Sequence, residues 1–230
     1  MEDAGNNYSV VINARLESKR LPRKLVRPFA GTTLLDIALT KLSRISCTNK
    51  YFAAHEEEEE LMAIYKKYED RIRFLPRSHK SVVQGKKHQG VTFEHYRDMP
   101  TQYIMSLNPC APMVAVNTLF DALSAFDNGN MRTMTSVTTE DNIFFDENGV
   151  LNAESYDVST QGNRPIYRMA HLFHIFDKEF FIQNGYFWDY SHNNPSLYVV
   201  RTSESADIDY LEDFQYCEWL YEKIISPNCK

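Results

Sequence analysis

Short apolar runs alternate with amphipathic helical patterns through the first half of the chain, and this alternation limits the fold more than any other feature. The strand-like runs are residues 8–14, 50–54, 71–75 and 102–107. The helical patterns are residues 33–45, 56–68 and 117–126. Strands separated by helical stretches form βαβ units, so the sequence predicts an α/β fold with a mainly parallel sheet.

Two helix starts have recognisable capping chemistry. Thr33 can cap the first helix, with Asp36 three residues further on. The five glutamates at 56–60 are expected to form the solvated first turn of the second helix, where negative charge suits the helix dipole.

The pattern changes after residue 131. Short strand-like runs at 134–138, 142–145 and 150–152 surround the turn Asp146-Glu-Asn-Gly149, and Asn-Gly between apolar runs predicts a hairpin. We therefore expect a small antiparallel excursion within a single domain of residues 1–230. The rest of the chain is expected to hold a loop at 153–165, strands at 166–176 and 197–200, and a final helix at 210–225.

Composition excludes several classes of protein. The chain has 230 residues and a formal net charge of -6, whereas general nucleic-acid or anionic-membrane binding needs a basic face. The first residues lack the basic and apolar regions of a signal peptide, and no apolar run reaches membrane-spanning length. The four cysteines form no CxxC pair, so free thiols and a cytoplasmic protein are expected.

Positive charge is concentrated directly after the first strand. Five cations lie within residues 15–24, namely Arg15, Lys19, Arg20, Arg23 and Lys24. Ligands of open α/β sheets bind at the carboxyl ends of strands, and Arg and Lys suit phosphate oxygens. No GxxxxGK[ST] or GxGxxG motif occurs, so a phosphate site here would depend on side chains. A solvated surface loop explains the same composition, and both interpretations stay open.

Two aspartates near the end of the chain provide a second candidate site. Asp207 and Asp209 point to the same side of an extended segment, where they can hold Mg²⁺ together with phosphate oxygens. The alternative is that Asp209 caps the final helix with Glu212, which leaves Asp207 unexplained.

Two further pairs of residues have ambiguous roles. His171 and His174 lie three apart in a strand-like run, so we expect them to face opposite sides and not to share a metal. Arg164 and Arg168 either receive a carboxylate or are ordinary surface arginines.

Three separated segments resemble one family. Residues 14–24 resemble the ARxxSKxxPxK signature of CMP-sugar synthetases, residues 107–113 are similar to their LQPTSPL segment, and residues 207–214 to their DIDxxxDF motif. These enzymes are cytidylyltransferases that activate sialic acids and related 2-keto sugar acids. The resemblance implies a nucleotide-diphospho-sugar transferase (Rossmann-like) fold with CTP and an acidic sugar as substrates. It also implies a homodimer that forms through residues 139–190 and uses Mg²⁺.

The resemblance assigns roles to individual positions. It implies that a sugar hydroxyl attacks the α-phosphate of CTP, with Lys19 and Arg15 as catalytic residues and Asp207 and Asp209 as metal ligands. The nucleotide-binding positions are Ala14, Arg15, Ser18, Lys19, Lys24, Arg77 and Asn108, and the substrate-binding positions are Asn108 and Arg168. Arg20 and Arg23 fall at variable positions of the signature and are expected to be solvated.

The chain departs from the family pattern at the base and sugar ends. Leu25 replaces an asparagine, Val114 an arginine and Ala170 a sugar-contacting asparagine, and no aspartate follows Arg77 at the usual place. A non-catalytic relative that binds a nucleotide or a protein partner is therefore the alternative hypothesis. A nucleic-acid-binding module is disfavoured, because the basic loop contains no aromatic residues for base stacking.

Overall fold

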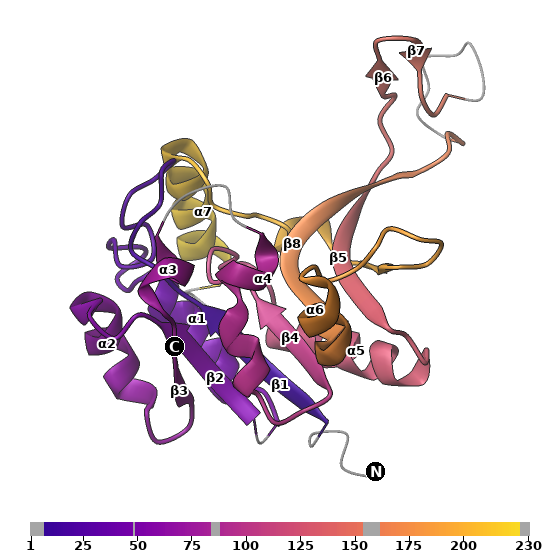
Figure 1. Ribbon diagram of the computed structural model, residues 1–230. Helices are drawn as coiled ribbons and strands as arrows, with labels where there is room; N and C mark the ends of the chain where they lie inside the picture. The colour runs from indigo at the N-terminus through magenta and orange to yellow at the C-terminus, as the bar shows by residue number, and fades with distance from the viewer. Residues whose placement is uncertain (1–6, 48, 84–87, 154–161, 226–230) are drawn as a thin grey trace.

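A seven-stranded sheet forms the centre of the computed structural model, with the strand order β3-β2-β1-β4-β8-β5-β9 (Figure 1). The structure describes residues 7–47, 49–83, 88–153 and 162–225. The strands are β1 Tyr8–Asn13, β2 Asn49–Ala54, β3 Arg73–Pro76, β4 Tyr103–Leu107, β5 Thr133–Glu140, β8 Ile166–Asp177 and β9 Ser196–Val199. Only β8 runs antiparallel to its neighbours β4 and β5, which confirms the predicted α/β fold and mainly parallel sheet.

Helices cover both faces of this sheet and connect its strands (Figure 1). They are α1 Leu34–Arg44, α2 Glu59–Tyr65, α3 His79–Val82, α4 Gln89–Thr92, α5 Val116–Asn128, α6 Lys178–Asn184 and α7 Leu211–Ile224, with 3₁₀ turns at Lys66–Tyr68, Glu94–Asp98 (η3) and Thr202–Glu204. The sequence predicted α1, α2, α5 and α7. The short helices α3, α4 and α6 were not predicted, because four to seven residues are too few for an apolar periodicity to be seen.

The central strand β1 separates two apolar cores. Val10 and Ile12 point into a core shared with α1, α5 and α7, whereas Val11 points into a second core with η3 and α6. All three side chains are fully buried, since successive side chains of a strand face opposite sides and both sides are covered.

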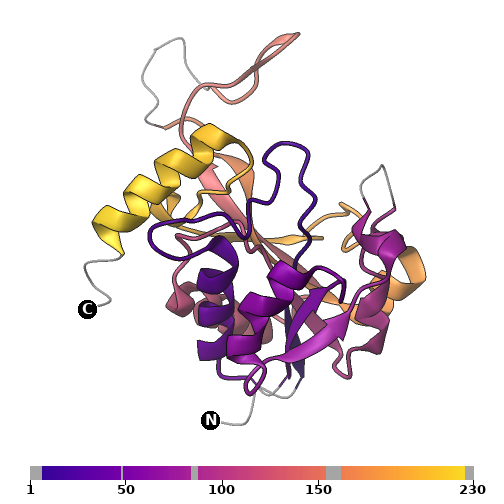
Figure 2. The same cartoon turned by 90° about the vertical axis from the view of Figure 1, so that its left-hand side faces the viewer.

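The last helix lies beside the loop that follows the first strand (Figure 2). Phe29 packs edge-on against Phe214 and Tyr221 of α7, with ring centroids 5.2 and 5.6 Å apart. The backbone N–H of Ala30 donates to Glu218 at 2.8 Å. The two segments that carry the basic loop and the Asp-x-Asp motif are therefore neighbours in space.

Strands β5 and β8 extend beyond the sheet as an arm that ends in a separate two-stranded hairpin (Figure 1). The hairpin consists of β6 Phe145–Asp146 and β7 Gly149–Val150, which confirms the antiparallel excursion with shorter strands than predicted. Most of the loop predicted at 153–165 lies outside the described residues. In the described part of the chain, no helix is both long and apolar enough to cross a membrane.

Replacement of Thr33 tests whether its side chain caps the start of α1. The Thr33 hydroxyl accepts a hydrogen bond from the Asp36 N–H at 3.1 Å, as predicted. We expect Thr33→Ala to lower the free energy of unfolding by about 1 kcal/mol, because one helix N–H loses its acceptor. Urea denaturation would measure the change, with Thr33→Ser expected to keep wild-type stability. A loss no larger than that of Ser46→Ala, at an exposed position after the helix, would contradict the capping role.

Candidate active site

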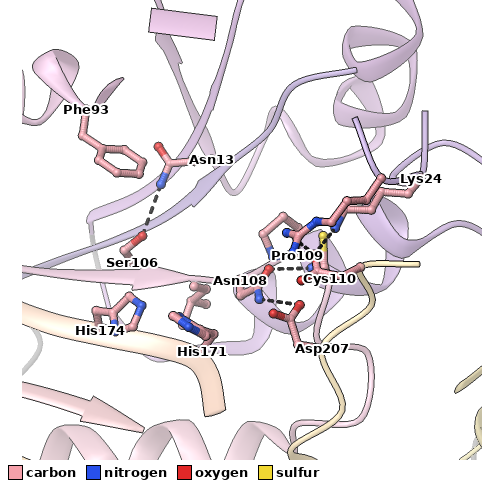
Figure 3. Close-up of a pocket in the computed structure, with 13 residues that line it drawn as sticks. Asn13, Lys24, Phe93, Ser106, Asn108, Pro109, Cys110, His171, His174 and Asp207 are labelled. Atoms are coloured by element: carbon pink, nitrogen blue, oxygen red, sulfur yellow. Dashed lines mark hydrogen bonds and ion pairs between the residues drawn. The ribbon is translucent and has the colours of Figure 1, made fainter. Parts of the chain in front are cut away.

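A pocket of about 410 Å³ opens at the carboxyl ends of β1 and β4. Its walls come from the loop after β1, the turn after β4, strand β8 and the segment before α7, with Phe93 from the stretch before η3 (Figure 3). This is the edge of an α/β sheet at which ligands are expected to bind.

Lys24 joins the two ends of the chain across this pocket. Its ammonium donates to the backbone oxygen of Ile208 at 2.5 Å and to Asp209 at 3.1 Å. Burial works to lower the pKa of Lys24, but its neighbours Cys110 and Asp209 outweigh burial and raise that pKa above its ordinary value. Lys24 therefore stays charged at neutral pH while it is largely withdrawn from solvent.

Arg20 and Arg23 are exposed, as predicted, but both also form ion pairs that the sequence did not indicate. Arg20 forms an ion pair with Asp209 at 2.6 Å, lies over the ring of Tyr210 and lines the pocket. Arg23 pairs with Glu60 of α2. These partners were not foreseen because both are distant in sequence and belong to other segments of the chain.

The prediction that all five glutamates at 56–60 form the solvated first turn of the second helix is wrong. Helix α2 begins at Glu59, and the Glu58 carboxylate accepts a hydrogen bond from the Leu16 N–H at 2.5 Å. This contact holds the first part of the basic loop, at Leu16, and the Glu60–Arg23 ion pair holds its later part. Two of these glutamates therefore hold the loop in place.

The remaining predicted triphosphate residues lie on the outer part of the same loop. Arg15 and Lys19 are exposed, and neither they nor Ser18 line the main pocket. The Ser18 hydroxyl accepts from the Leu21 N–H at 3.5 Å, and Ala14 is buried at the end of β1. Of the residues predicted to hold the triphosphate, Lys24 lies in the pocket. Contacts of Arg15, Ser18 and Lys19 with a nucleotide stay a prediction.

Asn108 orients one of the two carboxylates (Figure 3). Its side-chain amide donates to Asp207 at 3.0 Å, and its oxygen accepts from the Cys110 N–H at 2.9 Å. Burial is the main cause that raises the pKa of Asp207, and the nearby charge of Asp209 adds to it. The ionised form of Asp207 is thus incompletely balanced by the protein.

Asp209 does not cap the final helix, so that alternative is wrong. The N–H groups of Asp209 and Tyr210 donate to the Asp213 carboxylate at 3.0 and 2.8 Å, and α7 begins at Leu211. Asp213 thus accepts from the two residues that precede the helix, and the Asp209 side chain is instead paired with Lys24 and Arg20.

The two aspartates have the chemistry of a magnesium site that shares its ion with a phosphate ligand. The described residues contain no group of three or more His, Cys, Asp or Glu side chains placed to hold a metal. Mg²⁺ commonly binds through one or two carboxylates plus substrate phosphates, rather than in an all-protein cage. A cation beside Asp207 would also offset the charge that raises its pKa. The residues present therefore fit Mg²⁺ bound together with phosphates.

Two predicted arginines lie away from the pocket. Arg77 is buried, and its guanidinium donates to the backbone oxygens of Ala14 and Thr92, both at 3.1 Å, and to Ser81. It fastens the end of β1 to the α3–α4 region. Arg168 is exposed on the arm and forms an ion pair with Glu140 at 2.8 Å. Direct contacts of either arginine with a substrate stay predictions.

His171 and His174 both line the pocket, so the prediction that they face opposite sides is wrong. A bulge interrupts the pairing of β8 with β5 between Thr135 and Val137, and it changes which side of the strand His171 faces. The two rings lie 5.7 Å apart in an edge-to-face arrangement.

The floor of the pocket contains a polar network that the sequence did not reveal. The Asn13 side chain lies 2.8 Å from the His95 ring and donates to Tyr96 at 2.6 Å and to Ser106 at 3.2 Å. The available signal was a polar residue at the end of a buried strand, but its partners belong to η3 and β4 and could not be identified from the sequence.

Lys41 of α1 holds the turn after β4 through hydrogen bonds to its backbone. Its ammonium donates to the backbone oxygens of Pro112 and, at 3.4 Å, Ala111. The same turn accepts the Ile208 N–H at the Cys110 oxygen, at 3.0 Å, so Lys41 indirectly supports the Asp-x-Asp segment. Burial lowers the pKa of Lys41 to about 7, although the charge of Glu204 opposes this shift.

The lowered pKa of Lys41 predicts a contribution to the free energy of unfolding that depends on pH. Between pH 7 and the ordinary lysine value of 10.5, the unfolded chain binds the proton that the folded chain releases, so the contribution of Lys41 to stability rises with pH. From pH 7 to pH 9 this rise amounts to about 2 kcal/mol, and Lys41→Met should lack it. Urea denaturation of both proteins at the two pH values would measure the difference. Parallel pH profiles would show that Lys41 is charged in the folded state throughout.

Comparison with solved structures shows the fold. The chain is similar to the CMP:2-keto-3-deoxy-manno-octonic acid synthetase complexed with CTP, with a TM-score of 0.66, 11% identity, and coverage of 94% of this chain and 98% of that one. It is also similar to the 4-diphosphocytidyl-2C-methyl-D-erythritol synthase from Anaerococcus prevotii, with a TM-score of 0.66, 16% identity, and coverage of 94% and 96%. A cytidylyltransferase from Leptospira borgpetersenii gives a TM-score of 0.56 at 16% identity, with coverage of 95% and 88%.

The sequence itself places the chain in a family. No curated protein matches it significantly. Residues 9–226, however, match the family profile described as Cytidylyltransferase, and this range contains both the basic loop and the Asp-x-Asp segment. The chain therefore belongs to the cytidylyltransferase family.

Proposed function

We propose that this cytidylyltransferase transfers CMP from CTP to a hydroxyl of an acidic 2-keto sugar and releases pyrophosphate. The observation that carries the proposal is the contact of Lys24 with Asp209, which joins the basic loop to the Asp-x-Asp motif at one pocket. The similarity to a CMP:2-keto-3-deoxy-manno-octonic acid synthetase complexed with CTP supports the nucleotide and the acceptor class.

The pocket suits a reaction that depends on positioning and on charge. The acceptor hydroxyl oxygen forms a bond to the α-phosphorus of CTP and gives up its proton to solvent. The bond from that phosphorus to the bridging oxygen breaks, and pyrophosphate leaves with the electron pair. Lys24 and Arg20 line the pocket, and Arg15 and Lys19 project from the same loop. We infer that these cations orient the triphosphate and that Lys19 neutralises the departing pyrophosphate, since such transfer depends mainly on electrostatic stabilisation.

Asp207 and Asp209 would hold Mg²⁺. When bound, the ion would supply charge neutralisation to the phosphates. Asn108 keeps Asp207 in place through its amide, and Lys24 and Arg20 balance Asp209 when no substrate is present.

A second candidate function is that of a non-catalytic relative that binds a nucleotide or a protein partner. Leu25, Val114 and Ala170 are buried and apolar where the family pattern has polar residues, so these positions offer no side-chain hydrogen bond to a ligand. Calorimetry that shows CTP binding without turnover on any acceptor would favour this candidate.

Replacement of Lys19 and Asp209 tests the catalytic proposal. We expect Lys19→Ala and Asp209→Asn each to lower the rate of pyrophosphate release at least about 100-fold, because each removes a charge that faces the phosphates or the metal. The assay would use CTP, Mg²⁺ and 2-keto-3-deoxy-manno-octonic acid. Arg44→Ala, on an exposed position of α1, is the matched control. Wild-type rates in both variants would exclude the mechanism.

A pyrophosphate-release screen defines the substrates. It would combine the four ribonucleoside triphosphates with a panel of 2-keto sugar acids. CTP is expected to give the highest kcat/KM. An equal or higher value with another nucleotide would overturn the assignment of CTP.

We also propose that the arm mediates a homodimer. In the described part of the arm, the large apolar side chains of Phe145, Val150, Leu151 and Tyr167 are exposed in the single chain. A second copy that packs on the arm would remove this apolar surface from water.

Light scattering tests the dimer. The wild type is expected to give twice the chain mass of 26.8 kDa, and Phe145→Asp with Val150→Asp should shift it towards the single-chain mass. A wild-type mass of one chain at micromolar concentration would disprove the dimer.

A further inference from the structure

The bulge beside β8 brings the His171 side chain into the pocket. In regular pairing, His171 and His174 would face opposite sides of the strand, since they lie three residues apart. Here the register shifts between Thr135 and Val137, and His171 has a left-handed backbone with a φ of 54°. Both histidines consequently line the pocket (Figure 3).

The neighbouring strand holds this unfavourable backbone in place. A left-handed conformation is uncommon for a histidine, and strained residues of this kind cluster at functional sites. The fully buried Ser136 hydroxyl accepts hydrogen bonds from the Leu172 N–H at 2.9 Å and from the Phe173 N–H at 3.3 Å. These contacts fix the backbone directly after His171 and therefore the point at which its side chain enters the pocket.

The His171 ring is accessible to a ligand. The residue is exposed, and within the described part of the chain its ring forms no hydrogen bond. The ring packs edge-on against that of His174, with centroids 5.7 Å apart. Because histidine is the side chain that commonly changes charge near physiological pH, an accessible imidazole at this position can take up a proton from a bound hydroxyl group.

His174 is unsuited to this task. Its Nδ1 lies 2.8 Å from the Thr135 hydroxyl, and its ring packs against Phe187 and Trp188 at centroid distances of 5.8 and 5.2 Å. Burial, with a smaller contribution from the charge of His171, lowers the pKa of His174 to about 3. So weak a base does not accept a proton efficiently at neutral pH.

The other titratable groups of the described lining that could accept a proton are also unsuited. Cys110 is buried, and burial raises the pKa of its thiol to about 11, so that the thiol keeps its own proton. The proposed function assigns Asp207 and Asp209 to Mg²⁺, and a carboxylate that holds a cation is a weaker proton acceptor. His171 is therefore the best general base that the described lining offers.

Negative charge near His171 favours the imidazolium that proton uptake would form. Burial is the main cause that raises the pKa of Asp207, and the charge of His171 acts against it, so the two groups interact. The cations of the lining, Lys24 and Arg20, are paired with Asp209. A triphosphate carries more negative charge than one Mg²⁺ neutralises, so its presence also stabilises a cation at His171.

We propose that His171 is the general base of the reaction and relays the proton of the acceptor hydroxyl to solvent. The inference rests on the proposed function. The O–H bond breaks towards the imidazole, and its electron pair stays on the oxygen that bonds to the α-phosphorus. The bond to the bridging oxygen breaks, and pyrophosphate leaves with that electron pair. Because His171 is exposed, the imidazolium can return its proton to water before the next turnover.

Two substitutions of His171 test this role. Glycine and asparagine both tolerate a left-handed backbone, so His171→Gly and His171→Asn are expected to fold. Each should lower kcat for pyrophosphate release about 100-fold and leave the KM for CTP unchanged, because general-base catalysis contributes a factor of this size. His192→Asn, at an exposed position outside the pocket, is the control. Since asparagine keeps a hydrogen-bonding side chain, a loss in His171→Gly alone would indicate a binding role and overturn the proposal.

Chemical rescue separates a base from a structural contact. His171→Gly removes the ring from an exposed position, so added imidazole can enter the space and is expected to raise kcat at least about 10-fold. Pyrazole has a similar size but is a far weaker base, and it should restore much less activity. Failure of imidazole to restore activity, or equal rescue by both compounds, would overturn the general base.

The pH dependence of kcat gives a second readout. A general base must be uncharged before it reacts, so the wild-type kcat should fall from about pH 8 to about pH 6 as histidine becomes protonated. The residual kcat of His171→Gly should fall less over the same range. Parallel profiles of the two proteins would contradict the proposal.

These measurements distinguish the inference from the function on which it depends. A wild-type protein that releases no pyrophosphate with any nucleotide and 2-keto sugar acid would disprove both. Turnover by the wild type with an unchanged kcat in both His171 variants would disprove the general base alone and leave the proposed function intact.

Discussion

The site depends on one ion pair, that of Lys24 with Asp209. It connects a residue of the first loop to a residue of the last one at 3.1 Å, and the same ammonium binds the backbone of Ile208. The contact is partly shielded from water, so salt and solvent screen its Coulomb attraction less than that of an exposed pair. Because it fixes the Asp-x-Asp segment against the basic loop, it brings the two candidate motifs together at one pocket.

In this acidic chain, carboxylates of other segments balance only part of the positive charge of the basic loop. Glu58 and Glu60 of the α2 region anchor the two sides of the loop, and Asp209 balances Arg20 and Lys24. Arg15 and Lys19 stay exposed. The unbalanced positive charge is thus confined to the outer part of the loop, where it can attract a polyanion without making the whole protein basic.

Local patterns predicted most of the fold, because they act within a few residues. Thr33 caps α1, and the buried strands follow from short apolar runs such as 8–14. The sequence also located the two motifs of the site. It did not predict the partners of Arg20 and Glu58, which lie on other elements. It also missed the role of Asp213, because the cap considered from the sequence, Asp209 with Glu212, lies one position before the pair Tyr210 and Asp213 that the structure has. Such choices depend on the tertiary structure.

The bulge at His171 shows most clearly what a periodic pattern cannot reveal. One shift in strand register moves a side chain from one face of a sheet to the other, and the sequence of β8 contains no glycine to mark it. The shift is stabilised by Ser136, a residue of the neighbouring strand. Backbone geometry within one strand can therefore bring a side chain into the pocket that the regular strand period would turn away from it.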